Sequence, residues 1–197
     1  MNYRTLPRGY RHVEYMDFVR NRRQLLTVNL SALCATALLI VLGLMTHSIR
    51  DAWRAMNARW WLWFVLAGML IAYIPLHELT HGAFMYALSR VKPRYGIKLA
   101  YAYAGSTVWF DRKSHILIAL APVVIWGIAL QALIAALPEQ PWFWMLWAVQ
   151  ISNFSGSAGD IYCVVHLIRL KGDLLIQDTG TRMHIMRKTI PIEENKR

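Results

Sequence analysis

Cysteine and acidic residues are both scarce in this 197-residue chain. Its two cysteines, Cys34 and Cys163, each fall inside an apolar stretch, so the sequence predicts no disulfide framework. Asp and Glu number 11 against 22 Lys and Arg, which gives a formal net charge of +11. Charged residues make up 17% of the chain and hydrophobic residues 56%. This composition is typical of a membrane protein and excludes an ordinary soluble domain.

Four segments contain long apolar runs, and a helix needs about 20 such residues to cross a hydrocarbon core. They cover residues 25–46, 60–89, 116–137 and 141–168. No small-residue cleavage pattern follows the first, which therefore reads as a retained helix rather than a signal peptide. We predict a single membrane-embedded domain over residues 1–197, with an all-α polytopic fold of four transmembrane helices.

Short strands are expected outside the spans. Aromatic and aliphatic residues alternate with small or polar ones over residues 95–104, a period of two that is typical of a strand. We expect a β-hairpin here, with its turn at residues 104–106 and its second strand at residues 107–110. A weaker hairpin is expected after the fourth span, with residues 178–180 as its turn. Residues 1–23 carry mixed charge and aromatics, and we expect a partly helical segment at the membrane surface.

The basic residues are unevenly distributed between the two sides of the predicted bundle. If the spans alternate in direction, 19 of the 22 Lys and Arg fall on one side and 3 on the other. The positive-inside rule then places both termini and the loop at residues 90–114 in the cytoplasm. Topology and anionic lipid account for the positive charge, so nucleic-acid binding is not expected.

Residues 77–81 read HELTH, inside a span where ionisable groups are costly and usually functional. His77 and His81, four residues apart, share one helix face and can present two imidazole nitrogens to a single ion. Glu78 projects about 100° around the helix, beside such an ion, where it can take a proton from water. Zinc lowers the pKa of bound water to about 7. The motif therefore predicts a zinc site with two ligands and a base.

Asp160 is the candidate third ligand. HELTH lies 17 to 21 residues into the second span and Asp160 lies 19 residues into the fourth, so their depths match. It is also the only acidic residue inside the first, third or fourth span. Together with Glu78 it would balance the charge of Zn²⁺. Other candidates are weaker, because Cys163 fits apolar packing and His115 and His166 fit ordinary interfacial positions.

Small residues precede this aspartate in the stretch SNFSGSAGD, residues 152–160. Small residues allow close helix packing. Asn153 could donate a hydrogen bond to a developing oxyanion, or it could join two helices through its amide. Packing is the favoured interpretation, and both stay open.

HELTH in one span followed by an aspartate in a later span resembles the site-2-protease class of intramembrane metalloproteases. The likeness is closer to a small bacterial family of zincin peptidases, with a span carrying H-E-L-x-H, a tyrosine-bearing strand-like link and a later G-S-x-G-D. The matching elements are residues 77–81, 101–103 and 156–160. This resemblance implies zinc, one ion per chain, on His77, His81 and Asp160, with Glu78 as general base.

The chain departs from the site-2-protease pattern, in which a segment with asparagine and proline ends in Leu-Asp-Gly. Here Gly159 precedes the aspartate and Ile161 follows it, which leaves the oxyanion role of Asn153 open. The strand-like residues 97–103, with Tyr101 and Tyr103, could pair with an unwound substrate, since a helical substrate hides its peptide bonds. They could equally be a hairpin that anchors two spans.

The function expected is that of a zinc-dependent intramembrane or juxtamembrane endopeptidase of the bacterial cytoplasmic membrane, acting on membrane-anchored proteins or peptides. One alternative is a non-catalytic, metal-stabilised membrane scaffold or chaperone-like partner. Another is a transporter that uses Glu78 and Asp160 as a proton relay. The sequence itself assigns no oligomeric state.

Overall fold

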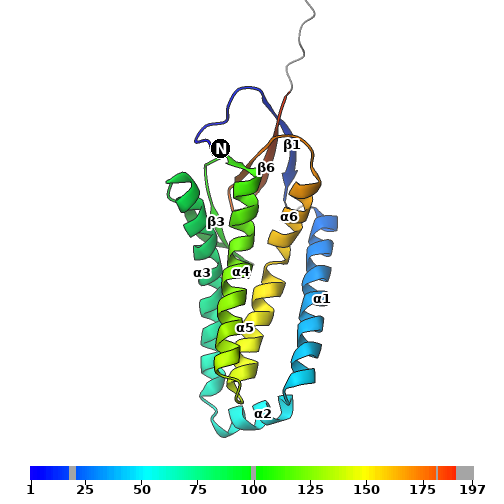
Figure 1. Cartoon of the computed structure of the whole chain (residues 1–197), viewed down its shortest axis with the longest axis vertical. Coiled ribbons are helices and arrows are strands. Elements are labelled where there is room, and N and C mark those ends of the chain that lie inside the picture. Colours follow the sequence, from blue (N-terminus) through cyan, green and yellow to red (C-terminus); the bar gives the residue numbers. More distant parts are fainter. Residues whose placement is uncertain (18–20, 99–100, 181, 190–197) are drawn as a thin grey trace, which may run out of the picture.

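The computed structural model describes residues 1–17, 21–98, 101–180 and 182–189. Their helices form an elongated bundle, and the strands lie together at one end of it (Figure 1). The helices are α1 (Arg22–Thr46), α2 (Ile49–Ala58), α3 (Leu62–Ser89), α4 (Arg112–Ala136), α5 (Trp142–Gly156) and α6 (Ala158–Arg169). The strands are β1 (Tyr10–Met16), β2 (Arg94–Lys98), β3 (Tyr101–Gly105), β4 (Phe110–Asp111), β5 (Leu174–Asp178) and β6 (Met183–Lys188).

Three helices, α1, α3 and α4, are long and apolar enough to cross a membrane, which indicates a membrane protein. Local signals define their ends. The Asn21 side chain caps α1 by accepting from the N–H groups of the first turn, and Asp111 caps α4 by accepting from Ser114. Helix α3 ends at its C-terminal cap, Arg90, which has a left-handed backbone with φ of 56°.

The fourth expected span is not a continuous helix. Residues 141–168 are divided into α5 and α6 at Ser157, whose hydroxyl donates to the carbonyl of Asn153 at 2.8 Å. The stretch of small residues weakens the helix at this point, because glycine and serine are poorer helix formers than alanine or leucine. Neither half alone has the length of a span, so three candidate spans are found and not four.

A four-stranded sheet, in the order β1-β6-β5-β4, makes the fold mixed rather than all-α. The hairpin expected with its turn at residues 178–180 is confirmed as β5 and β6. The partly helical segment expected near the N-terminus is wrong, because β1 pairs antiparallel with β6, Tyr10 opposite Lys188. Met16 is 2% exposed and packs in an apolar cluster with residues of α6, β5 and β6, so tertiary burial decides the conformation of this segment.

A hairpin between α3 and α4 is confirmed, but its expected strands and turn were wrong. Strands β2 and β3 pair antiparallel from Lys98 opposite Tyr101 to Arg94 opposite Gly105, so residues 95–104 contribute to both strands, and residues 104 and 105 belong to β3 rather than to a turn. At Ser106 the backbone leaves β3, and its N–H donates to the carbonyl of Asp178 at 2.7 Å. Strand β4 then joins β5 in the larger sheet.

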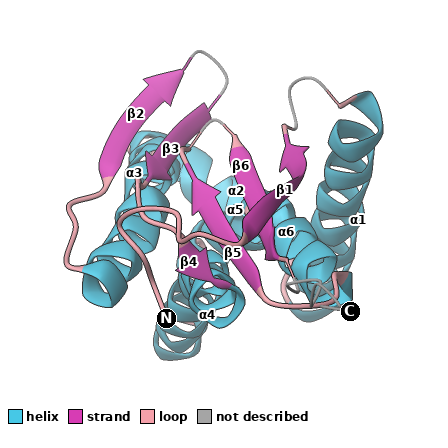
Figure 2. Cartoon of the chain, turned by 90° about the horizontal axis from the view of Figure 1, so that it is seen from above, coloured by secondary structure: helices cyan, strands magenta, loops and turns pink. Residues whose placement is uncertain are grey.

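Both sheets lie across the same end of the bundle, opposite α2 (Figures 1 and 2). The smaller sheet is held against α3 at a glycine. A Cβ atom on Gly82 would lie 2.0 Å from the Tyr95 hydroxyl, so glycine at this position leaves room for the Tyr95 side chain of β2 to pack directly against the helix. The hairpin therefore sits directly beside the turn of α3 that carries HELTH.

Candidate metal centre and active site

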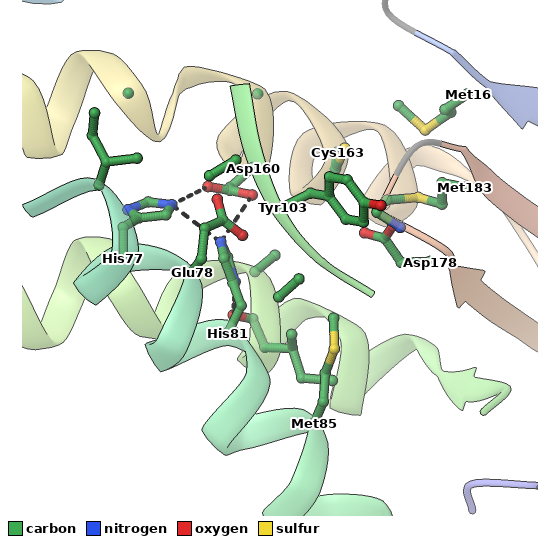
Figure 3. Close-up of a pocket in the computed structure, with 18 of the residues that line it drawn as sticks. Met16, His77, Glu78, His81, Met85, Tyr103, Asp160, Cys163, Asp178 and Met183 are labelled. Carbon is green, nitrogen blue, oxygen red and sulfur yellow. Dashed lines mark hydrogen bonds and ion pairs between the residues drawn. The ribbon is translucent and has the colours of Figure 1, made fainter. Parts of the chain in front are cut away.

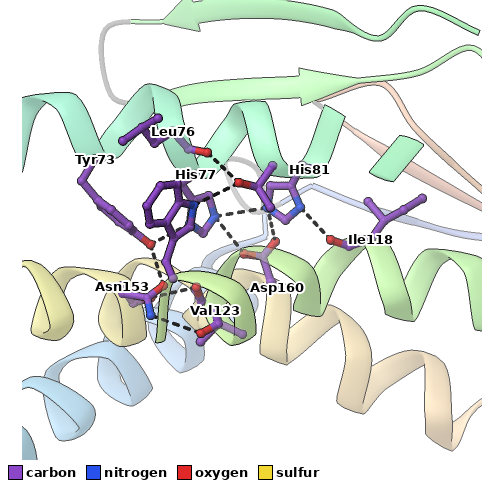
Figure 4. Close-up of polar contacts among 11 residues, drawn as sticks. Tyr73, Leu76, His77, His81, Ile118, Val123, Asn153 and Asp160 are labelled. Atoms are coloured by element: carbon purple, nitrogen blue, oxygen red, sulfur yellow. Dashed lines mark hydrogen bonds and ion pairs between the residues drawn. The ribbon is translucent and has the colours of Figure 1, made fainter. Parts of the chain in front are cut away.

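The two histidines of HELTH lie on the buried side of α3, as their spacing predicts. His77 is 9% exposed and His81 is 8% exposed, and their Nε2 atoms are 3.1 Å apart. Residues four apart on a helix stack on one face, so both rings point toward the same space between α3 and α6 (Figure 4).

Asp160 meets these histidines from α6. Its Oδ2 lies 3.4 Å from His77 Nε2, and its Oδ1 lies 3.5 Å from His81 Nε2. The break at Ser157 places Asp160 in the first turn of a new helix, where the helix dipole favours a carboxylate. Of the described residues, these three form the only group of His, Cys, Asp or Glu close enough together to hold a metal ion.

The donor atoms of these three residues have the spacing of a metal site. Zinc bonds of 2.0 to 2.1 Å in a tetrahedral arrangement separate neighbouring ligand atoms by about 3.3 to 3.4 Å. The two Nε2 atoms are 3.1 Å apart, and they lie 3.4 and 3.5 Å from different oxygens of the Asp160 carboxylate, so these separations bracket that value. Two imidazoles and one carboxylate are also common zinc ligands, with a fourth position left for water or substrate. His77, His81 and Asp160 therefore fit a catalytic zinc ion.

Hydrogen bonds at the far side of each ring fix which nitrogen faces the cluster. His81 Nδ1 donates to the carbonyl of Ile118 on α4 at 2.9 Å, because a carbonyl can only accept. Its Nε2 lone pair is thereby left for a metal.

The His77 ring is held by a chain of three groups. Asn153 Nδ2 donates to the Val123 carbonyl at 3.2 Å, which turns the amide oxygen of Asn153 toward Tyr73. The Tyr73 hydroxyl donates to that oxygen at 2.6 Å and so accepts from His77 Nδ1 at 3.1 Å (Figure 4). The Nε2 lone pair of His77 therefore also faces the cluster.

The position of Asn153 bears on its two proposed roles. Its side chain has no exposed surface, and it contacts Tyr73 and Val123 rather than lining the cavity beside the cluster. These contacts favour the packing interpretation. Tyr73 was missed in the sequence, although its position four residues before His77, on the same helix face, was an available signal. The partner carbonyls of Ile118 and Val123 carry no sequence signal, because every residue has one.

Glu78 lies beside the cluster rather than in it (Figure 3). It is partly buried, and the backbone N–H of Ala104 on β3 hydrogen-bonds to its carboxylate. A cavity of about 940 Å³ adjoins both groups. Tyr103 lines this cavity from β3, whereas the side chain of Tyr101 lies outside the described residues.

The cavity extends from the cluster to the larger sheet, where Met16, Met183 and Asp178 line it. Burial raises the pKa of the Asp178 carboxyl to about 6, although the bond it accepts from the Gly180 N–H opposes the shift. Burial, followed by the nearby charge of Glu78, also raises the pKa of Tyr95. The walls thus combine apolar side chains with a few ionisable ones, as ligand-binding cavities do.

Residues 70–175 match the model of the family described as "Putative zincin peptidase". The chain belongs to this family. The matched region contains HELTH, the β2–β3 hairpin and Asp160, so membership of this zincin family and the geometry of the cluster both indicate a zinc peptidase. Searches of curated proteins and of solved structures found no match.

Proposed function

We propose that this zincin is a membrane-embedded zinc endopeptidase that cuts membrane-anchored proteins or peptides within or next to the bilayer. The observation that carries the proposal is the convergence of three ligand residues, whose donor atoms lie 3.1 to 3.5 Å apart, beside a glutamate and a large cavity. A purely structural metal site is closed by protein ligands. The adjoining cavity therefore favours catalysis over the scaffold alternative.

In the proposed reaction His77, His81 and Asp160 would hold zinc. Bound zinc would lower the pKa of a water molecule and polarise the substrate carbonyl. Glu78 takes a proton from the attacking water and later delivers it to the leaving amine. The N–H of Ala104 orients the Glu78 carboxylate for this transfer. Tyr73 and Ile118 hold the histidine rings in the tautomer that the ligands require.

Strand β3 is proposed to position the substrate. In an antiparallel pair, alternate residues direct their N–H and C=O groups away from the partner strand. Because the Ala104 N–H faces Glu78, Ala102 has the same outward orientation, and both residues line the cavity. An extended substrate segment could add to this edge, which would hold its peptide bonds beside the cluster.

We further propose that α5 and α6 together make a fourth crossing of the bacterial cytoplasmic membrane, with the sheets on the cytoplasmic side. This arrangement is supported by the basic residues, because 19 of the 22 belong to segments at the sheet end of the bundle or to the termini. It would place the metal cluster toward the cytoplasmic face, within reach of water.

The direct test compares membranes containing the wild-type protein with membranes containing Glu78→Gln. We expect one zinc per chain in both proteins, and new peptide N-termini, detected by mass spectrometry, only with the wild type. Glu139→Gln, the same change at an exposed position before α5, serves as the matched control. Wild-type protein without bound metal would contradict the proposal, and equal N-termini from Glu78→Gln would favour the scaffold alternative.

A further inference from the structure

His115 is a third histidine of the cavity, and the metal cluster does not use it. It lies in the first turn of α4, one turn before Ile118, the residue whose carbonyl holds His81. The sequence suggested an ordinary interfacial histidine, but the ring is only 2% exposed and lines the cavity. That part of the sequence interpretation was wrong, because strand β4 and the sheet cover this end of α4.

The ring nitrogens of His115 differ from those of its two neighbours. His77 and His81 each direct Nδ1 to a protein partner. His115 Nδ1 is buried and has no hydrogen-bond partner in the described part of the chain. A buried polar atom without a partner costs about 1 to 3 kcal/mol, so this unpartnered nitrogen calls for an explanation in terms of a ligand or a reacting group.

The surroundings identify what that group would be. His115 lines the same cavity as Glu78, His81 and Asp160, which places it beside the metal cluster. It approaches from α4, whereas Glu78 belongs to α3 and is held by β3. A substrate carbonyl bound between them would have a base on one element and an imidazole on another, and an imidazole N–H directed at the carbonyl oxygen would stabilise charge on that oxygen.

We propose that His115 is a catalytic residue that donates a hydrogen bond to the substrate carbonyl oxygen as it becomes negatively charged. The inference rests on the proposed peptidase function. As the water oxygen bonds to the carbonyl carbon, a water proton moves to Glu78 and the carbonyl π electrons move to the oxygen. His115 keeps its proton throughout. When the C–N bond breaks, its electron pair leaves with the nitrogen, which takes the proton from Glu78. The electron pair on the oxygen then re-forms the carbonyl.

The test measures binding of two probes to the zinc-loaded, full-length protein in detergent. The first is a capped alanyl–alanine phosphinate, whose tetrahedral phosphorus oxygens imitate the charged carbonyl oxygen. The second is acetohydroxamate, a planar metal chelator. His115→Phe removes the donor and should weaken phosphinate binding by about 10- to 100-fold with little change for acetohydroxamate. His115→Gln, which keeps an N–H, should retain part of the affinity, and the exposed His12→Asn should match the wild type.

Each other outcome separates the inference from the function on which it rests. Equal phosphinate affinity in wild type and His115→Phe would overturn the role of His115 and leave the peptidase proposal intact. Failure of both probes to bind the wild type would overturn the peptidase proposal itself. If the variants do not fold, diethyl pyrocarbonate labelling of the wild type decides the question. We expect His115 to be modified and to be protected by the phosphinate, and labelling without protection would contradict the proposal.

Discussion

Individual residues around the cluster differ in whether they bind the metal or orient its ligands. Tyr73 belongs to the second group, because its hydroxyl bridges Asn153 and His77. Groups that orient metal-binding histidines typically change metal affinity by 10- to 100-fold when they are removed. The hydroxyl is therefore expected to matter for zinc affinity more than for folding.

Tyr73→Phe should weaken zinc binding by about 10- to 100-fold while helix content stays unchanged. Competition with a chromophoric chelator measures the dissociation constant. Tyr86→Phe is the matched control, since Tyr86 lies on the same helix but is 44% exposed. Unchanged affinity in Tyr73→Phe would mean that His77 keeps its orientation without the hydroxyl.

Asp178 should make the metal-free protein less stable as the pH rises. Its folded-state pKa of about 6 exceeds the ordinary value of 3.8, so the folded state binds the extra proton between those values. The stabilisation is complete below about pH 4 and is lost as the pH passes 6. Asp178→Asn keeps the oxygen that accepts from Gly180 but cannot ionise.

We therefore expect Asp178→Asn to be more stable than the wild type by about 1 to 3 kcal/mol at pH 7.5, with the difference closing only below about pH 4. Denaturant titrations of the chelator-treated proteins at each pH measure this difference in the free energy of unfolding. The exposed Asp173→Asn controls for the loss of surface charge. A difference that does not vary with pH would contradict the assignment.

Among the elements, the β2–β3 hairpin is the one whose position the proposed function needs most. The last residue of β3, Gly105, packs closely against the β5–β6 turn. A Cβ atom added to Gly105 would lie 2.5 Å from the backbone carbon and oxygen of Thr179. Backbone atoms cannot move aside as a side-chain end can. Gly105 thus sets the distance between β3 and the β5–β6 turn.

Gly105→Ala should displace β3 and lower peptidase activity at least tenfold, with a loss of stability of about 1 to 3 kcal/mol. Zinc content should stay at one per chain, because the ligands come from α3 and α6. Metal analysis beside a cleavage assay separates the two effects. Gly68→Ala is the control, since a Cβ at Gly68 meets no atom within 4 Å. Full activity in Gly105→Ala would show that the position of β3 is not critical.

The helices were predicted from the sequence better than the strands. Apolar runs located α1, α3 and α4 because burial in lipid needs only composition and length. The turn of the β2–β3 hairpin and the conformation of residues 10–16 were mispredicted, because both depend on contacts with distant segments, such as Met16 with β6. In the metal cluster the i, i+4 spacing and matched depth identified the three residues. Tyr73 and His115 needed the three-dimensional packing.

At the scale of the whole molecule, the orientation proposed from the charge distribution can be tested directly by labelling single cysteines. Single cysteines replace Ala58 at the end of α2 and Lys171 after α6, both exposed, in a chain whose native cysteines are changed to alanine. An impermeant maleimide should label Ala58→Cys in intact cells. It should label Lys171→Cys only after the membrane is opened. The reverse pattern would invert the proposed topology.

The pairing of β1 with β6 also has a consequence for the order in which the protein is built. Among the described strands β1 has β6 as its only partner, so residues 10–16 must wait for residues 183–188 to be synthesised before they can join a sheet. Met16 and Met183, one from each strand, both line the cavity. During translation HELTH and Asp160 are therefore synthesised before this wall of the cavity can form. We expect the nascent chain to contain all three metal ligands before the β1–β6 side of the cavity is complete.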